Sequence, residues 1–354
     1  MFLESLYSKN FRNFESLKLD LSPGRTIIVG NNGVGKTNLL EMIYFLSTFG
    51  SFRTSNDHDL LRFGESFFVV SGLYGDKEVK VHYSDRKEVF ISGIKQKSLR
   101  ESFGTIPVVA LTSHDLEIIN GLPSRRRRFM NIGISLYKRT YINYLSEYNR
   151  AKKQRNRLLQ GAKKGKSING IEVWEKQLST ATFPIISARN EFVNRLVQYA
   201  VPIFHQLTGR TLEIGYKKGG DYNNLELQLK RMRDTEIERG YTLFGPHRDD
   251  IILKVDSHPA QVSASFGIKR ILAISLRMAL SRILTEARGE EPIIIIDEVL
   301  GELDRRNLGA LSEFIQKSEK VLIATTRNDL MKNEDFNIYR IEEKNGAPLI
   351  RKGA

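Results

Sequence analysis

The stretch "RTIIVGNNGVGKTNLLEMIYFL" (residues 25–46) sets the fold class of this 354-residue chain. A run of β-branched residues leads into G-x-x-x-x-G-K-T, and an apolar run with helical spacing follows. That strand–loop–helix context distinguishes a phosphate-binding loop from an ordinary glycine turn. Its glycines allow successive backbone N–H groups to converge on phosphate oxygens, and the helix adds the positive end of its dipole. The sequence therefore predicts a nucleotide site in an α/β domain.

Two side chains of the loop have separate predicted tasks. Lys36 reaches the β- and γ-phosphates of ATP, and the Thr37 hydroxyl completes the coordination shell of Mg²⁺. The residues predicted to contact the nucleotide here are Gly30, Asn31, Asn32, Gly33, Val34, Gly35, Lys36, Thr37 and Asn38.

A second motif, "EEPIIIIDEVLGELD" (residues 290–304), places two acids after four isoleucines. A continuous apolar run predicts a strand buried on both faces, as in a parallel sheet. Asp297 is predicted to hold Mg²⁺ through the water shell of the ion, opposite Thr37, and Glu298 is the predicted base that polarises the attacking water. Two solvated acids at a surface strand are the alternative, which the isoleucines disfavour.

The chain between these motifs is too long for one small sheet. Lys36 and Asp297 are 261 positions apart (297 minus 36), so a large insertion separates two halves of the nucleotide domain. From about Leu116 the strand patterns stop, and apolar residues recur at helical spacing. The segment "QGAKKGKSINGI" (residues 160–171) has the composition of a helical-hairpin tip.

Positive charge is concentrated in the same region. Residues 121–170 contain fourteen Lys and Arg against the single acid Glu147, so this window holds +13 of the chain's +14. Segregated charge of one sign indicates a polyanion partner, most often nucleic acid. The alternative is a solvated helix face, although such faces usually mix both signs. Four consecutive arginines, 125–128, cannot share one helix face, so some are expected to make internal contacts.

Composition narrows the remaining choices. The chain has no cysteine, which excludes disulfides, thiolate catalysis and zinc–thiolate sites. No apolar run approaches the length of a membrane span, and the N-terminus does not resemble a secretory signal. We expect a cytoplasmic, nucleoid-associated protein without a membrane partner.

A third stretch, "SASFGIKRILAISLRMAL" (residues 263–280), begins with small residues and continues as a helical apolar pattern. A helix N-terminus of this kind favours an anion. An ordinary helix start before a buried stripe explains the local pattern equally well.

Together these motifs resemble the RecF family, bacterial recombination-repair ATPases related to the heads of structural-maintenance-of-chromosomes (SMC) proteins. "NFRNF" (10–14), "GSFRT" (50–54), "GLPSRRRRFMN" (121–131) and "LFGPHRDD" (243–250) are similar to family motifs, in family order. The resemblance implies a mixed α/β head of the ATP-binding-cassette (ABC) type at residues 1–116 and 240–354. A mainly helical lobe at 117–239 is inserted into it.

The resemblance also implies activity and partners. Family members bind ATP and Mg²⁺, form homodimers on ATP binding, hold duplex DNA near single-strand gaps, act with RecO and RecR, and hydrolyse ATP weakly. Carried over by motif position, Ser265 and Gly267 contact the partner subunit's ATP, Asp304 lies at the dimer interface, and Arg12 and Arg53 contact nucleotide. Asp115 in "LTSHDLE" takes the place of a loop acid near the metal. The expected DNA ligands are Arg125, Arg127, Arg150, Lys152, Lys153, Arg155, Lys163, Lys164 and Lys166.

The chain departs from the family pattern at three places. One is "LTSHDLE" (111–117), which stands where the family usually shows a proline and an acid. Phe266, Ile268 and Lys269 stand where the signature "S-Q-G-Q-Q-R" has glutamines. "ATTRND" (324–329) lacks a histidine to sense the γ-phosphate, for which Thr326 or Arg327 is a weak substitute.

Two other functions use parts of this pattern. A transporter's ATPase subunit has the same head but needs no +13 lobe. A nuclease or helicase needs its own catalytic centre, for which "GPHRDD" (245–250) is the densest candidate.

Overall fold

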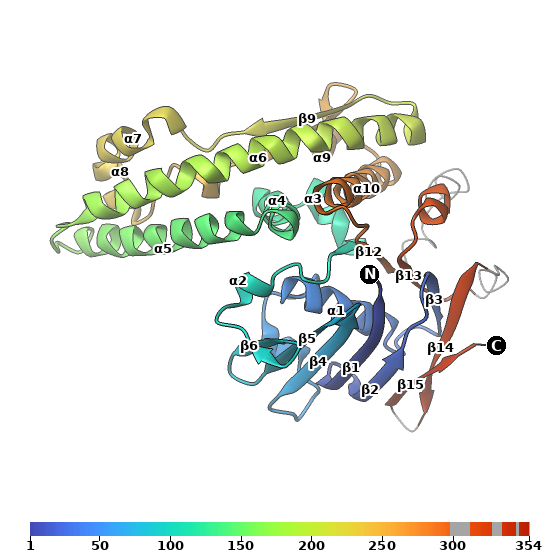
Figure 1. Ribbon diagram of the computed structural model, residues 1–354. Helices are drawn as coiled ribbons and strands as arrows, with labels where there is room; N and C mark the ends of the chain where they lie inside the picture. The colour runs from blue at the N-terminus through green and yellow to red at the C-terminus, as the bar shows by residue number, and fades with distance from the viewer. Residues whose placement is uncertain (298–311, 328–334, 345–346, 354) are drawn as a thin grey trace. The chain divides into compact units, whose positions relative to one another are not determined.

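The computed structural model describes residues 1–297, 312–327, 335–344 and 347–353, which form two compact units. Unit 1 comprises Met1–Leu116, Gln206–Thr208 and Phe266–Ala354, and unit 2 comprises Glu117–His205 and Gly209–Ser265 (Figure 1). Each unit has its own sheet and buried residues.

Unit 1 contains most of the strands. They are β1 (Leu3–Phe11), β2 (Phe14–Asp20), β3 (Arg25–Val29), β4 (Phe68–Tyr74), β5 (Lys77–Tyr83), β6 (Lys87–Ile91), β7 (Ile94–Lys95), β8 (Val108–Leu111), β12 (Ile293–Asp297), β13 (Val321–Thr325), β14 (Phe336–Lys344) and β15 (Ala347–Lys352). The helices of this unit include α1 (Lys36–Thr48), α2 (Leu99–Ser102) and α10 (Phe266–Arg288).

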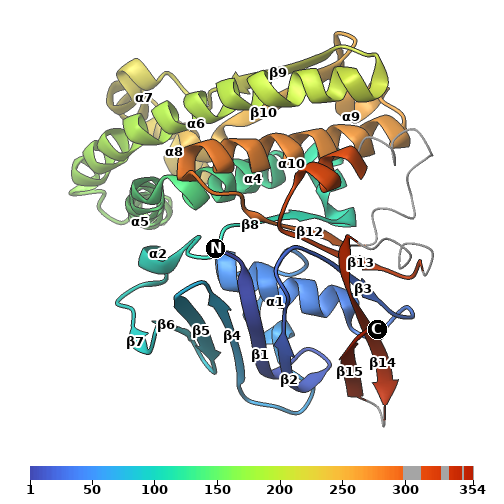
Figure 2. The ribbon, with the colours of Figure 1, turned by 45° about the vertical axis from the view of Figure 1, so that its right-hand side comes forward.

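The central sheet of unit 1 has the order β15-β14-β3-β13-β12-β8. All its pairs are parallel except β14–β15, so the predicted mixed sheet is confirmed. Figure 2 shows α1 and α10 on opposite sides of β12. Ile293, Ile294, Ile295 and Ile296 are all buried, because a parallel strand covered on both faces has no solvated side.

A second sheet of unit 1, in the order β2-β1-β4-β5-β6-β7, is antiparallel. Helix α1 contacts strands of both sheets and carries Phe45 into a fully buried aromatic cluster with Phe11 and Phe68. The Phe11 and Phe68 rings meet edge to face with centroids 5.3 Å apart, a favoured aromatic geometry. The helix that follows the phosphate loop is therefore held between two sheets.

Unit 2 is mainly helical. The elements that lie wholly or mostly in it are α3 (Leu116–Asn120), α4 (Pro123–Tyr137), α5 (Arg139–Ala162), α6 (Ile171–Thr208), α7 (Leu225–Arg231), α8 (Arg233–Arg239), α9 (Ala260–Ser263), β9 (Leu212–Lys217), β10 (Asp250–Val255) and β11 (His258–Pro259). Helices α5 and α6 lie side by side and are joined by residues 163–170 (Figure 1). This is the helical hairpin that the sequence predicts, with Tyr141, Tyr148, Leu178 and Phe192 of its apolar stripe buried.

The second domain boundary differs from the sequence prediction, which places residues 240–265 with the head. The structure groups these residues with unit 2. The physical reason is strand pairing, since β10 runs antiparallel to β9 over its whole length, from Asp250 opposite Lys217 to Val255 opposite Leu212.

Unit 2 encloses an ionic cluster around Arg155 of α5, whose side chain is fully buried. Its Nη2 lies 3.0 Å from Glu175 Oε1 of α6 and 2.5 Å from Glu236 Oε2 of α8. Arg233 adds a second cation, 2.5 Å from Glu175. Burial raises the pKa of Glu236, and the nearby Arg155 opposes this effect. The ion pairs of Arg155 thus join α5 to α6 and α8 away from water.

We predict that Arg155→Met destabilises unit 2 by about 3–5 kcal/mol, because two buried carboxylates lose a shared cation. Trp174, the only tryptophan, lies beside Glu175 in the chain, so its fluorescence during urea unfolding measures this. Arg157→Met, an exposed change on the same helix, should stay within about 0.5 kcal/mol of the parent. Equal effects of the two variants would contradict the structural role of the cluster.

Candidate nucleotide site and basic lobe

The phosphate loop connects β3 to α1 and has little room for side chains. A Cβ added at Gly30 would lie 2.4 Å from the Ile341 carbonyl oxygen. Gly33 and Gly35 have φ angles of 84° and 112°, which favour glycine. The sequence thus folds here into a loop whose backbone is accessible to a ligand, as a phosphate cradle requires.

Strand order brings the two predicted metal ligands together. In the parallel register, Val29 is opposite Thr325 and Ala324 is opposite Asp297, so β3, β13 and β12 end at one edge of the sheet. There Thr37 Oγ1 donates a hydrogen bond of 2.8 Å to Asp297 Oδ1. Octahedral Mg²⁺ has ligands at about 2.1 Å, so neighbouring ligands are about 3 Å apart. The two oxygens therefore fit adjacent positions on one Mg²⁺ ion.

The predicted phosphate ligand Lys36 begins α1 and is almost fully buried. Its Nζ donates to the carbonyl oxygens of Gly30, at 2.9 Å, and Asn31, at 2.8 Å. The ammonium group thus lies over the same loop whose N–H groups would bind phosphate. The other loop residues named from the sequence, Asn32 and Val34 among them, belong to this turn.

The loop is supported by Asn13, a residue that sequence reasoning did not single out. Asn13 lies between β1 and β2. Its Nδ2 donates to the Val34 carbonyl at 3.3 Å, and its Oδ1 accepts from Asn38 Nδ2 at 2.7 Å. Asn13 therefore holds the loop and the first turn of α1 from one side. Its position in "NFRNF" was the available signal.

Glu41 of α1 is a second unforeseen residue, and it organises the predicted nucleotide contacts Arg12 and Arg53. The Glu41 side chain is fully buried and receives two hydrogen bonds of 2.9 Å from Arg12. Arg53 Nη1 lies 3.5 Å from the same carboxylate and 2.8 Å from Asn38 Oδ1. The sequence feature that could have pointed to Glu41 is its place as a lone acid within an apolar helix. Both arginines are thus positioned next to the first turn after the loop.

Asp115 lies in the 3₁₀ turn Ser113–Asp115 of unit 1 and already has partners. Its Oδ1 accepts from Arg277 of α10, at 2.6 Å from Nη2, and its Oδ2 accepts from the Thr112 N–H at 2.8 Å. The Asp115 carboxylate raises the pKa of Arg277 against the opposing effect of burial. As placed, the Asp115 carboxylate anchors α10 through Arg277.

The start of α10 is accessible. Ser265, Phe266 and Gly267 are exposed, and a Cβ added at Gly267 would meet nothing within 4 Å. The Arg270 guanidinium lies 4.8 Å from the centre of the Phe266 ring, so the non-standard residue Phe266 packs on the arginine that the signature retains. The predicted base Glu298 and the predicted interface residue Asp304 lie outside the described residues.

The basic residues of unit 2 divide into exposed and internal groups. Arg125, Arg150, Lys153, Lys163, Lys164 and Lys166 are exposed, whereas Arg127 and Lys152 are partly buried. Arg126 pairs with Asp250 at 2.7 Å, which is the internal contact expected within the four arginines. The DNA contact predicted for Arg155 was wrong, because that side chain is fully buried and bound to two glutamates.

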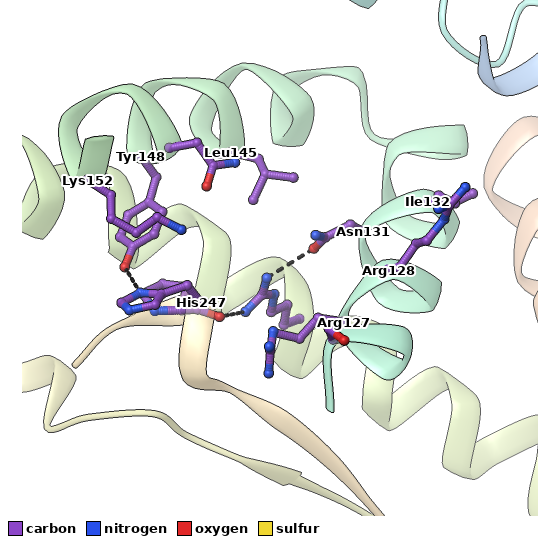
Figure 3. A pocket seen from close by; sticks show the side chains of 12 residues that line it. Arg127, Arg128, Asn131, Ile132, Leu145, Tyr148, Lys152 and His247 are labelled. Carbon is purple, nitrogen blue, oxygen red and sulfur yellow. Dashed lines mark hydrogen bonds between the residues drawn. The ribbon is translucent and has the colours of Figure 1, made fainter. Parts of the chain in front are cut away.

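The segment "GPHRDD" does not form a nuclease centre in this structure. Buried Asp249 accepts from Arg189 at 2.5 Å and from the hydroxyls of Tyr216 and Tyr222. His247 Nε2 lies 3.0 Å from the Thr242 carbonyl, so it donates, and Nδ1 accepts from the Tyr148 hydroxyl at 2.6 Å. Figure 3 shows the latter bond. Across the described parts of the chain, no group of three or more His, Cys, Asp or Glu could hold a metal ion.

Comparison with known proteins identifies the family. The profile of the RecF/RecN/SMC N-terminal domain matches residues 2–347. DNA replication and repair protein RecF of Lactobacillus johnsonii is 32% identical over 346 residues, which cover 92% of each chain. This chain belongs to the RecF family. The RecF of Desulfitobacterium hafniense is also 32% identical, over 97% of this chain and 98% of the relative.

Solved structures agree with this assignment. A structure described as the recombination mediator protein RecF-ATP in the RecFOR pathway superimposes with a TM-score of 0.92 at 29% identity. The match covers 100% of this chain and 98% of the other. The Smc head domain of Pyrococcus furiosus has a TM-score of 0.58 at 17% identity, which shows the fold alone. The fold is therefore that of the ABC-type ATPase heads shared by RecF and SMC proteins. Within the described residues, no helix is both long and apolar enough to cross a membrane.

We predict that Asn13→Ala weakens ATP binding about fivefold, because losing its contacts to the loop costs about 1 kcal/mol. Calorimetric titration with ATP and Mg²⁺ measures the affinity. Asn337→Ala is the matched control, since Asn337 also bonds a backbone carbonyl, that of Pro23, in unit 1. If both variants bind ATP like the parent, Asn13 does not support the site.

The pKa of His247 is lowered to about 4, first by burial and then by the nearby cations Lys152, Arg248 and Arg127. The imidazole is therefore neutral in the folded chain, whereas the unfolded chain takes up a proton below about pH 6.5. The neutral His247 therefore contributes to the free energy of unfolding above about pH 6.5, and this contribution is lost as the pH falls toward 4.

We predict that the parent loses about 2 kcal/mol of unfolding free energy between about pH 7.5 and 5 that His247→Gln does not lose. Urea unfolding followed by Trp174 fluorescence at each pH measures the difference. Identical pH dependence of the two proteins would show that the folded imidazole is protonated normally.

Proposed function

We propose that this protein is an ATP-dependent DNA-binding protein of recombinational repair, in which ATP brings two copies together on DNA. The 2.8 Å contact between Thr37 and Asp297 carries the ATP part, since it joins the phosphate loop to the strand end that would hold Mg²⁺. When bound, Mg²⁺ would neutralise charge on the β- and γ-phosphates. Lys36 contributes a second cation to the same phosphates.

The start of α10 supplies the link between ATP and association. In the proposal, exposed Ser265 and the N–H groups at Gly267 bind the γ-phosphate held by a second copy, and Asp304 lies at that interface. A helix N-terminus attracts an anion. The glutamine side chains of the usual signature are absent, so the contacts depend on the backbone and on Ser265. Glu298 polarises water for slow hydrolysis, which releases the dimer.

DNA binding is assigned to the exposed cations of unit 2. Arg125, Arg150, Lys153 and the hairpin-tip residues Lys163, Lys164 and Lys166 supply phosphate contacts that do not depend on base sequence. The RecF-ATP structure is described as part of the RecFOR pathway. The pathway name supports RecO and RecR as the partners, and the resemblance to the RecF family is the basis for proposing duplex DNA near single-strand gaps as the substrate. Membership of the RecF family and the absence of a metal cluster in the described residues disfavour the transporter and nuclease alternatives.

We predict that Lys36→Ala abolishes ATP-dependent association and DNA retention together, whereas Glu298→Gln lowers ATP turnover at least about 100-fold and leaves a dimer bound to DNA. Gel filtration with a labelled duplex and a phosphate-release assay measure the two effects. Lys153→Met, which removes a cation away from the loop, should still associate with ATP. Parent-rate hydrolysis by Glu298→Gln would contradict the base assignment.

A further inference from the structure

Unit 2 contains a cavity of about 390 Å³ that the nucleotide site does not use. Helices α4, α5 and α6 and the 3₁₀ turn Pro246–Arg248 contribute its lining (Figure 3). Four of the lining residues are cations, namely Arg127, Arg128, Lys152 and Arg189, and none is an acid. The remaining polar lining includes Ser124, Asn131 and Asn149, which can donate hydrogen bonds.

The charge of this cavity is only partly balanced by neighbouring carboxylates. Arg189 is paired, 2.5 Å from buried Asp249, and that carboxylate also accepts from two tyrosines. Arg127 donates to the Asp249 backbone carbonyl at 2.8 Å. Within the described residues, neither Arg127 nor Lys152 has a carboxylate within 4 Å. Asp250 and Asp249 partly compensate the charge of Arg127, whereas no carboxylate in the described part of the chain acts on the charge of Lys152.

Burial and the neighbouring cations both disfavour the charged forms of Lys152 and Arg127. Burial and then the neighbouring Arg127 and Arg248 lower the pKa of Lys152. Burial and then Arg189 lower the pKa of Arg127. His247, with both ring nitrogens occupied, forms a neutral part of the wall. Like charges held together in a partly buried cavity cost free energy, which a bound anion would recover.

We infer that this cavity is a phosphate-binding site, separate from the phosphate loop. A planar guanidinium from α4 and a compact ammonium from α5 suit a phosphate group, which accepts several charge-assisted hydrogen bonds at once. Lys152 is the residue to substitute in a test, because Arg127 also donates a hydrogen bond to the Asp249 backbone carbonyl. The phosphate belongs to a nucleic-acid strand or to a free phosphorylated compound, and the site does not depend on the ATP-controlled association proposed above.

The test uses the full-length chain with Lys36→Ala, so that the phosphate loop contributes little, and inorganic pyrophosphate as the probe. Calorimetry in low salt should show one site per chain. Adding Lys152→Met should weaken binding at least about 10-fold, which equals 1.4 kcal/mol. Adding Lys152→Arg should restore most of the affinity. Arg157→Met makes the same charge change at an exposed position of the same helix, and its binding should stay within about twofold of the background.

A short DNA duplex identifies the source of the phosphate. If Lys152→Met weakens both pyrophosphate and duplex binding while Arg157→Met does not, strand phosphates enter the cavity. If only pyrophosphate binding weakens, the natural ligand is a free phosphorylated compound.

Absence of stoichiometric pyrophosphate binding, or equal losses in Lys152→Met and Arg157→Met, would overturn the inference. Trp174 fluorescence during urea unfolding checks that each variant is folded. A chain that fails to associate with ATP could still bind pyrophosphate here, so the two proposals fail separately.

Discussion

The hydrogen bond between Thr37 and Asp297 is the constraint on which the nucleotide site depends. It joins residues 260 positions apart in the chain, and it requires β3, β13 and β12 to be parallel neighbours that end at one edge. Buried isoleucines hold β12 between β13 and β8, and the large insertion leaves this pairing intact. The ligand chemistry thus follows from the order of the strands.

Buried carboxylates position arginine side chains around this site and in unit 2. Glu41 positions Arg12 and Arg53, Asp115 holds Arg277, and Glu175 with Glu236 holds Arg155. Each pair links segments distant in sequence, and removing one partner leaves an uncompensated charge.

The sequence predicts the features that have a local pattern, and it does not predict those that depend on contacts between distant segments. The phosphate loop, the buried strand before Asp297 and the helical hairpin have local signals, and the structure contains each of them. Asn13 and Glu41 were missed because their partners come from other segments of the fold. Arg155 was misassigned because charge in a sequence window does not reveal which side chains turn inward. The second domain boundary was misplaced because the pairing of β9 with β10 has no local signature.

The central claim is that ATP controls association of two copies. Light scattering of the purified chain with Mg²⁺, with and without ATP, measures the mass directly, and a short duplex is added afterward. The account predicts a monomer without ATP, and with ATP a dimer that retains the duplex. A monomer that binds ATP without changing mass would contradict it, and the start of α10 would then be an ordinary helix end.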